Sequence, residues 1–303
     1  MGPSVDGSQG LTHTRSLGRR LSDLLASRPR LRLSLLLAGP MGWLVIAYLG
    51  SLLVLFIAAF WQLDPFTSQV VKETSFDNFR TIAEGEVYRN IVGRTVWIAA
   101  AVTVTDAILA FPIAFYMAKV ASPRVRALLV VAVLMPLWSS YLVKVYAWRL
   151  IFSEEGVMNW ALDPVGLSAP AFGNTTMWIT FTYLWLPFMV IPIYAGLERI
   201  PNSVLDASGD LGAGAWHTFR RVVMPLSLPA IVAGSIFTFS LTLGDYITPQ
   251  IVSGGKQFIG NVVYANVGVA NNLPLAAAFA TVPVLVMIVY LLIARRLGAF
   301  EAM

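Results

Sequence analysis

Two acidic side chains, Asp106 and Asp245, lie within or at the end of long apolar stretches of the chain. An ionisable side chain at bilayer depth costs about 2.5–3.5 kcal/mol on insertion scales, so each is a candidate functional group. Tyr246 directly follows Asp245, and Trp138 and Tyr141 lie close together in another apolar stretch. A carboxylate can replace water around an ammonium group, and Tyr or Trp faces add about 0.5–2 kcal/mol of cation–π attraction. We therefore expect Asp245 and the three aromatic residues to line a path for a solute.

Asp245 and Trp138 each have a structural alternative. Lys144 and Arg149 lie in the outward half of the stretch that contains Trp138, so Asp245 could end a helix and form a salt bridge with either of them. Trp138 could be an interfacial anchor, since Trp residues form belts at both membrane surfaces. The residues alone leave these alternatives open.

Asp106 lies midway along its apolar stretch, with Thr103 and Thr105 close by in the same predicted helix. A buried pair, or a hydrogen bond to one of these hydroxyl groups, would satisfy the carboxylate without any solute. We favour this interpretation, and contact between Asp106 and the solute is the alternative.

The composition excludes several kinds of chemistry. The chain has no Cys, which rules out disulfides, thiolate metal sites and a Cys nucleophile. Its two His residues, His13 and His217, are far apart, so we expect no metal site. There is no Gly-x-x-x-x-Gly-Lys-[Ser/Thr] phosphate loop, so no nucleotide site is expected either. We expect a chain that is not an enzyme and holds no cofactor of its own.

The elements that must position these residues are membrane helices. Of the 303 residues, 57% are hydrophobic and only 12% are charged, whereas soluble proteins average about 45–50% apolar and about 25% charged residues. A helix needs about 20 apolar residues to cross the hydrocarbon core of a bilayer. The sequence predicts an all-α integral membrane protein with six such spans, at about residues 34–60, 91–118, 127–152, 175–197, 226–246 and 273–294.

The distribution of basic residues predicts an orientation. The N-terminal leader, the second and fourth loops and the C-terminal tail together carry 14 Lys and Arg residues, against 5 in the segments on the other side. The positive-inside rule then places both termini in the cytoplasm, and it accounts for the net charge of +5 without nucleic acid. Residues 1–32 are expected to be a disordered basic leader, which is either a topology signal or a segment lying on anionic headgroups.

The segment at residues 200–225 does not resemble a simple connector. Pro201 starts a short predicted helix, Gly212 ends it, and a second amphipathic piece leads to Pro225. Such helices could rest on the membrane surface. The first helix, however, carries Asp206 and Asp210 and no basic residue, which suits an anionic leaflet poorly and favours docking in a groove of a soluble partner.

The same segment resembles the cytoplasmic signature loop of ATP-binding-cassette (ABC) importer permeases, whose pattern is Glu-Ala-Ala, three residues, Gly, nine residues and Ile-x-Leu-Pro. Asp206-Ala207-Ser208, Gly212 and Pro225 keep every spacing, and the departures from the pattern are conservative. The resemblance implies the type I importer permease (MetI-like) bundle, with residues 33–303 as the transmembrane domain. It also implies that Asp206, Ala207, Ser208, Asp210, Gly212 and Pro225 belong to an ATPase-coupling loop.

Other motifs are similar to the spermidine/putrescine branch of these permeases. They lie at residues 111–116, 136–148, 186–194, 243–249 and 254–261. This resemblance implies a cell inner-membrane subunit that imports polyamines together with three partners. These are a second permease that is a homologue of this chain, a cytoplasmic ATPase dimer that binds ATP and Mg²⁺, and an extracytoplasmic binding protein. Gly254, Gly255 and Lys256 would then dock the binding protein, or else form an ordinary connector.

Two other functions remain open at this point. Relatives in the same superfamily carry other cargo, such as organic amines, phosphonates or metal chelates. An ion-coupled secondary transporter, with Asp106 and Asp245 as coupling sites, is a rival from another class, but the sequence shows no convincing inverted repeat to support it.

Overall fold

The computed structural model describes residues 29–296, and the chain divides into two units, residues 1–55 and residues 56–303. Most of the expected basic leader, residues 1–28, lies outside the described residues. The first unit contains α2 (Pro29–Trp43), the π-helical turn η1 (Leu44–Leu49) and most of α3 (Gly50–Ala58). Because Leu36–Ala58 is apolar on all sides and none of it is buried, it has the character of a membrane span.

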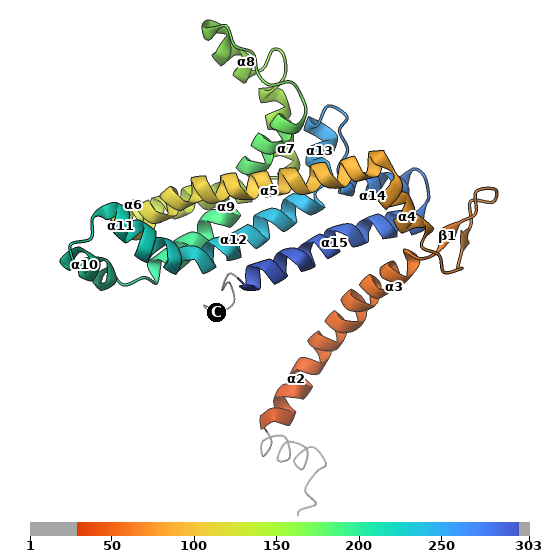
Figure 1. The fold of residues 1–303 in the computed structure, drawn as a ribbon, viewed down its shortest axis with the longest axis horizontal. Helices are drawn as coiled ribbons and strands as arrows, with labels where there is room; N and C mark the ends of the chain where they lie inside the picture. Colours follow the sequence, from red (N-terminus) through yellow and green to blue (C-terminus); the bar gives the residue numbers. More distant parts are fainter. Residues whose placement is uncertain (1–28, 297–303) are drawn as a thin grey trace, which may run out of the picture. The chain divides into compact units, whose positions relative to one another are not determined.

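Four long helices of the second unit form its bundle (Figure 1). They are α5 (Glu86–Phe115), α9 (Asn174–Glu198), α12 (Met224–Gly244) and α15 (Leu273–Arg296). The helices α5 and α9 pack together through two buried apolar clusters, one near each end of α9. A third cluster, of Ala99, Phe239 and Leu243, joins α5 to α12. Gly196 and Gly234 allow α9 and α12 to approach closely, because an added Cβ at Gly196 would lie 2.3 Å from the Ala230 Cβ.

Five helices are long and apolar enough to cross a membrane, and a bent pair of helices gives a sixth span if it is counted as one. The sequence predicts one continuous helix at residues 127–152. The structure instead has α6 (Pro123–Trp138) and α7 (Tyr141–Ile151), which meet at an angle of 92°. The break lies at Ser139 and Ser140, whose backbones are extended, with ψ values of 149° and 134°. The Pro136 carbonyl oxygen, near the end of α6, accepts hydrogen bonds from Ser139 Oγ (2.8 Å) and Lys144 Nζ (3.1 Å).

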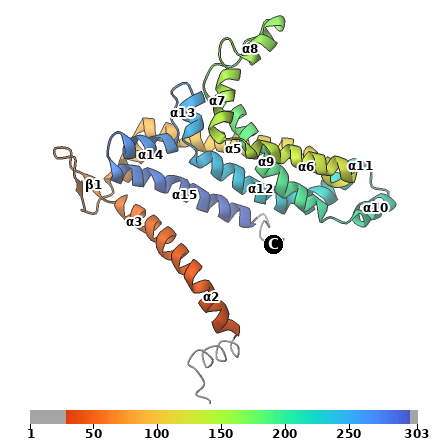
Figure 2. The ribbon, with the colours of Figure 1, turned by 180° about the vertical axis from the view of Figure 1, so that it is seen from behind.

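Shorter elements occupy the two ends of the bundle (Figures 1 and 2). One end carries α10 (Asn202–Asp210), α11 (Ala215–Thr218) and the π-helical turn η4 (Phe219–Val223). The other end carries an antiparallel hairpin of β1 (Gln62–Leu63) and β2 (Val70–Val71), followed by α4 (Asp77–Glu84). It also carries α13 (Ile247–Val252) and α14 (Ile259–Gly268), while α8 (Val157–Leu162) and the 3₁₀ turn η3 (Asp163–Val165) follow α7.

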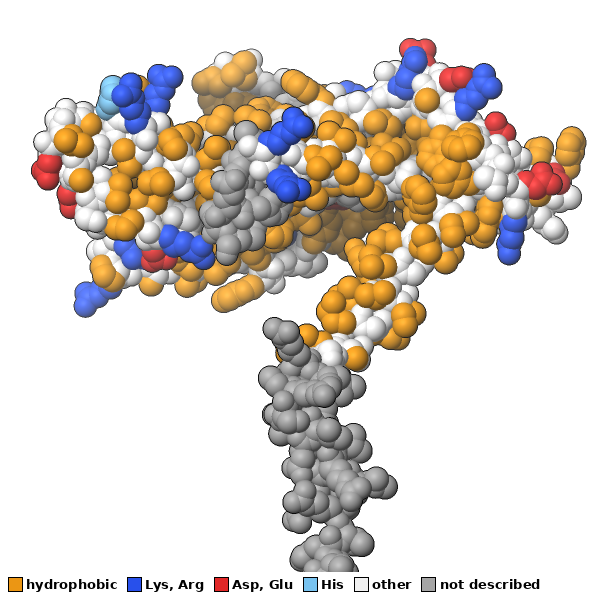
Figure 3. All heavy atoms as spheres, turned by 60° about the horizontal axis from the view of Figure 1, so that its bottom comes forward, with side chains coloured by type: hydrophobic (Ala, Val, Ile, Leu, Met, Phe, Trp, Pro, Cys, Tyr) orange, Lys and Arg blue, Asp and Glu red, His pale blue; other side chains and the backbone are white. Residues whose placement is uncertain are grey.

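The surface of the bundle is consistent with a bilayer environment. Figure 3 shows hydrophobic side chains over much of its middle, while most charged side chains lie toward its ends. Exposed apolar residues such as Trp97, Ile108 and Leu285 are 72%, 67% and 55% exposed. Large exposed apolar surfaces of this kind indicate contact with lipid or with other protein chains.

Candidate functional site

The segment at residues 200–225 contains a short helix that ends at a glycine. Pro201 has an extended conformation before α10, and Gly212 has a φ of +77°, in the left-handed region that favours glycine. The Gly212 N–H donates to the Gly209 carbonyl (2.8 Å), and the Ala213 N–H donates to the Ser208 carbonyl (3.1 Å). This pair of bonds is a Schellman motif, which stops the helix at a defined residue. The predicted helix, glycine break and second helix are therefore present.

The acidic face of α10 is open to solvent. Asp206 and Asp210 are exposed, and neither forms a salt bridge within the part of the chain that the structure describes. Ser208 Oγ lies 2.9 Å from Thr218 Oγ1, which ties α10 to α11. Ala207 is exposed beside them. The end of α10 is thus fixed by hydrogen bonds, while its two carboxylates are exposed on the surface.

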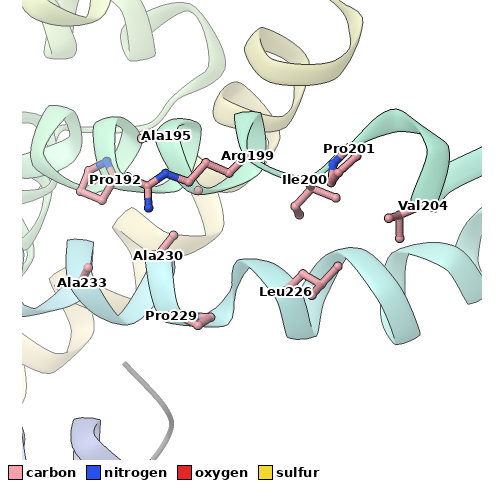
Figure 4. A pocket seen from close by; sticks show the side chains of 11 residues that line it. Pro192, Ala195, Arg199, Ile200, Pro201, Val204, Leu226, Pro229, Ala230 and Ala233 are labelled. Carbon is pink, nitrogen blue, oxygen red and sulfur yellow. The ribbon is translucent and has the colours of Figure 1, made fainter. Parts of the chain in front are cut away.

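The α9–α10 junction and the start of α12 enclose a hollow of about 410 Å³ (Figure 4). Pro192, Ala195 and Arg199 approach it from the α9 side, Ala230 approaches it from α12, and Val204 lies on α10. Pro225 lies just before this part of α12, at its N-terminal turn. The segment at residues 200–225 is therefore continuous with the ends of two long helices, α9 and α12.

At the opposite end of α12, Asp245 is held by hydrogen bonds. Its Oδ1 accepts from the backbone N–H groups of Ile247 (2.7 Å) and Thr248 (3.2 Å). Its Oδ2 accepts from Thr248 Oγ1 (3.0 Å) and from the Tyr141 hydroxyl. Tyr141 Oη also lies 2.6 Å from Thr248 Oγ1. Asp245 therefore caps the start of α13 and joins it to the start of α7.

The salt bridge that was the structural alternative for Asp245 is absent from the described residues. Lys144 Nζ instead donates to the Pro136 carbonyl, and Arg149 Nη1 donates to the Ile251 carbonyl (3.3 Å). Both basic residues satisfy carbonyl groups near helix ends, where cations are favourable. Four nearby donors already satisfy the Asp245 carboxylate, so it needs no ammonium or guanidinium partner.

Aromatic residues gather around this end of the bundle. Tyr141 stacks on Trp185 with 5.9 Å between ring centroids, and Tyr246 stacks on Tyr264 at 5.1 Å. Trp138, at the end of α6, is 80% exposed. The sequence did not single out Trp185 or Tyr264 as site residues. Trp185 directly precedes the motif at residues 186–194, but nothing near Tyr264 in the sequence indicates its partner.

Asp106 lies apart from these residues, on the buried face of α5. It is 0% exposed, and neither of its carboxylate oxygens has a hydrogen-bond partner among residues 29–296. The expected bonds to neighbouring hydroxyl groups are absent, because Thr103 Oγ1 donates to the Ala99 carbonyl (2.7 Å) and Thr105 Oγ1 donates to the Ala101 carbonyl (2.8 Å). Asp106 is therefore enclosed in the bundle in this conformation and does not face an open path.

The loop at Gly254, Gly255 and Lys256 lies at the end of the bundle opposite α10. Gly254 and Gly255 have φ values of +62° and +92°. A Cβ at Gly254 would lie 2.7 Å from the Phe172 carbonyl oxygen, so this position has no room for a side chain. Lys256 is exposed, and with Gly255 it lines a shallow hollow of about 290 Å³. The loop has a fixed backbone and a basic side chain that a partner can reach.

No group of three or more His, Cys, Asp or Glu residues that could hold a metal ion occurs within residues 29–296. The structure instead places two different sets of features at the two ends of the bundle. A helix with free carboxylates lies at one end, an aromatic cluster and two broken helices lie at the other, and α9 and α12 connect them.

Comparison with known proteins identifies the family. Residues 91–299 match the family described as "Binding-protein-dependent transport system inner membrane component". The inner membrane ABC transporter permease protein YdcU of Escherichia coli (strain K12) is 46% identical over 299 residues, covering 94% of this chain and 95% of that protein. The spermidine/putrescine transport system permease protein PotB of Haemophilus influenzae is 32% identical, covering 63% of this chain and 68% of that protein.

Solved structures share the fold. A bacterial alginate ABC transporter, in complex with a periplasmic protein carrying an alginate pentasaccharide, contains a chain with a TM-score of 0.72 and 17% identity. That match covers 92% of this chain and 97% of the other. The MetNI methionine ABC transporter contains a chain with a TM-score of 0.51 and 17% identity, covering 70% of this chain and 96% of the other. The chain belongs to the binding-protein-dependent transport system inner membrane component family and is an inner-membrane permease of an ABC importer.

Proposed function

We propose that this permease conducts polyamines, such as spermidine or putrescine, in an ATP-driven import complex. Importer membership follows from the family match and from a relative that is similar over nearly the whole chain. Support for the cargo comes from the motifs shared with the spermidine/putrescine branch and from the names of the PotB relatives. The aromatic cluster is suited to cations, since Tyr and Trp faces attract ammonium groups.

The observation that carries the coupling role is the exposed acidic helix α10, closed at Gly212 and joined to α9. We propose that α10 docks in a groove of a partner ATPase, with Asp206 as its main charged contact. ATP and Mg²⁺ bind that ATPase and not this chain. Closure of the ATPase pair then moves α10, and α9 and α12 carry the movement toward the opposite end of the bundle.

The other partners follow from the same arrangement. A second permease, which we expect to be a homologue, completes the path across the membrane. An extracytoplasmic binding protein delivers the cargo to the end that carries Gly254, Gly255 and Lys256. Basic residues at the α10 end, including Arg220 and Arg221, support a cytoplasmic position for that end and for both termini.

Within the path, the aromatic residues and the acids have different roles. Tyr246 and Trp138 are accessible and are proposed to contact the cargo. Tyr141 and Asp245 are bonded to each other, so we propose that they shape the path by holding two helix breaks together. Asp106 contacts cargo only if the bundle opens around it.

Uptake by the complete complex in proteoliposomes tests this function. The complex of both permeases and the ATPase is reconstituted with ATP inside, and the binding protein is added outside with labelled putrescine or spermidine. We expect uptake that requires both ATP and the binding protein. Uptake that persists without the ATPase, driven by an ion gradient, would show a secondary transporter instead. ATP-dependent uptake of other organic cations or anions, without polyamines, would overturn the cargo assignment alone.

A further inference from the structure

The turn between α5 and α6 lies against the junction between α9 and α10. This turn contains the π-helical segment η2 (Tyr116–Val120). Lys119 Nζ on η2 donates to the Ile200 carbonyl and lies 3.4 Å from Asn202 Oδ1 at the start of α10. The side chain of Lys119, in the turn between α5 and α6, thus reaches the first residues of the 200–225 segment.

A second basic residue reinforces the same junction. Arg126 of α6 forms a salt bridge with Glu198 at the end of α9, with 3.4 Å between Nη1 and Oε1. Arg126 also donates to the Met117 carbonyl (3.0 Å) and the Ala118 carbonyl (3.3 Å). Tyr194 donates its hydroxyl to the same Glu198 oxygen (3.1 Å). One guanidinium group therefore links η2, α6 and α9.

Apolar contacts join the same parts. Met117 and Ala118 are buried in one cluster with Leu197 and Ile200. Val223 of η4, which leads into α12, belongs to the same cluster. The polar contacts therefore surround a packed core, and packed cores move as units rather than deforming continuously.

We propose that Lys119, Arg126 and Glu198 form a latch that transmits movement of the coupling helix to α5 and α6. The chain connects α10 directly to α9, and connects it through α11 and η4 to α12. The α5–α6 turn has no such covalent link to the loop, so only side-chain and packing contacts can move it with α10. The inference rests on the proposed function, and it assigns these three side chains a positioning role in coupling.

The first test separates transmission from docking. Lys119→Met is made in the complete complex, with Lys119→Arg as the conservative variant. A second pair compares Arg126→Met with Arg124→Met, because Arg124 is exposed on the same helix and has no salt bridge among the described residues. ATPase copurification, melting temperature, ATP hydrolysis and labelled putrescine uptake are measured for each variant.

We expect Lys119→Met and Arg126→Met to retain the ATPase and its hydrolysis while the uptake per ATP falls by at least about tenfold, since each variant loses one or more charge-assisted hydrogen bonds. Lys119→Arg and Arg124→Met should behave like the wild type. Wild-type uptake per ATP in both Met variants would overturn the latch, as would loss of the ATPase from them. Failure of the proposed function would appear differently, as a wild-type complex with no ATP-dependent uptake.

A cross-link provides an independent test, because the chain contains no Cys of its own. The double variant Lys119→Cys/Asn202→Cys should show low uptake per ATP until a short bifunctional thiol reagent joins the two positions. The covalent link should then restore uptake, since the proposal requires these positions to move together. If the cross-link forms and uptake stays low or falls further, the two segments must separate during transport and the latch is wrong.

Discussion

The hydroxyl of Tyr141 donates a hydrogen bond to the carboxylate of Asp245, and so joins the break between α6 and α7 to the break between α12 and α13. Irregular backbone at membrane depth is tolerated where protein groups satisfy it. Asp245 does this for α13, because its Oδ1 accepts from two backbone N–H groups. The carboxylate therefore holds a junction of helix ends, which is a different task from binding an ammonium group.

Tyr141→Phe removes only the hydroxyl group from this junction. Losing a partly buried hydrogen bond to a carboxylate should lower the free energy of unfolding by about 1–2 kcal/mol. We expect a lower melting temperature in detergent and reduced uptake. Tyr146→Phe is the control, because Tyr146 lies on the same helix and is 53% exposed. An unchanged melting temperature in Tyr141→Phe would show that the bond contributes no stability.

Asp106→Val should stabilise the protein. The side chain is 0% exposed and has no hydrogen-bond partner in the described part of the chain, and burying an unpaired polar group costs about 2–7 kcal/mol depending on the reference state. Asp106→Asn keeps a polar group at the site, so it should gain much less. Thermal melting checks both variants, and uptake should remain near wild type. A stable Asp106→Val protein that no longer transports would place Asp106 in the solute path.

The sequence predicts the fold better than it predicts the contacts of polar side chains. Apolar length locates the spans, and the position of Gly212 locates the end of α10, because both signals are local. The 92° bend after Pro136 was missed, since proline is common in membrane helices and only tertiary contacts decide how far the helix turns. The partners of Asp245 were also missed. Tyr141 is more than 100 residues away in the sequence. Lys144 and Arg149 lie in the same stretch as Tyr141, and the sequence alone does not show which of the three side chains binds Asp245.

Gly212→Ala and Gly209→Ala should have opposite effects on α10. Gly212 has a φ of +77°, and placing a Cβ in the left-handed region costs about 1–2 kcal/mol. Gly209 lies inside the helix with nothing within 4 Å of an added Cβ, so alanine there should gain about 0.5–1 kcal/mol. ATPase copurification from detergent extracts measures the outcome. We expect weaker copurification for Gly212→Ala and equal or stronger copurification for Gly209→Ala, and equal loss in both would contradict this account of the helix end.

Asp206 offers the most direct test of docking, because its side chain is exposed and forms no salt bridge within the described part of the chain. Asp206→Lys reverses the charge without disturbing any of the hydrogen bonds that close α10. Since juxtaposed like charges cost several kcal/mol at an interface, ATPase copurification and uptake should fall by at least about tenfold. Asp206→Glu restores the usual family residue and adds one methylene, so it should bind the ATPase as tightly as the wild type or more tightly. If the Asp206→Lys complex retains both ATPase copurification and transport, then α10 does not dock through this residue, and the carboxylate contributes only to the solvation of the helix.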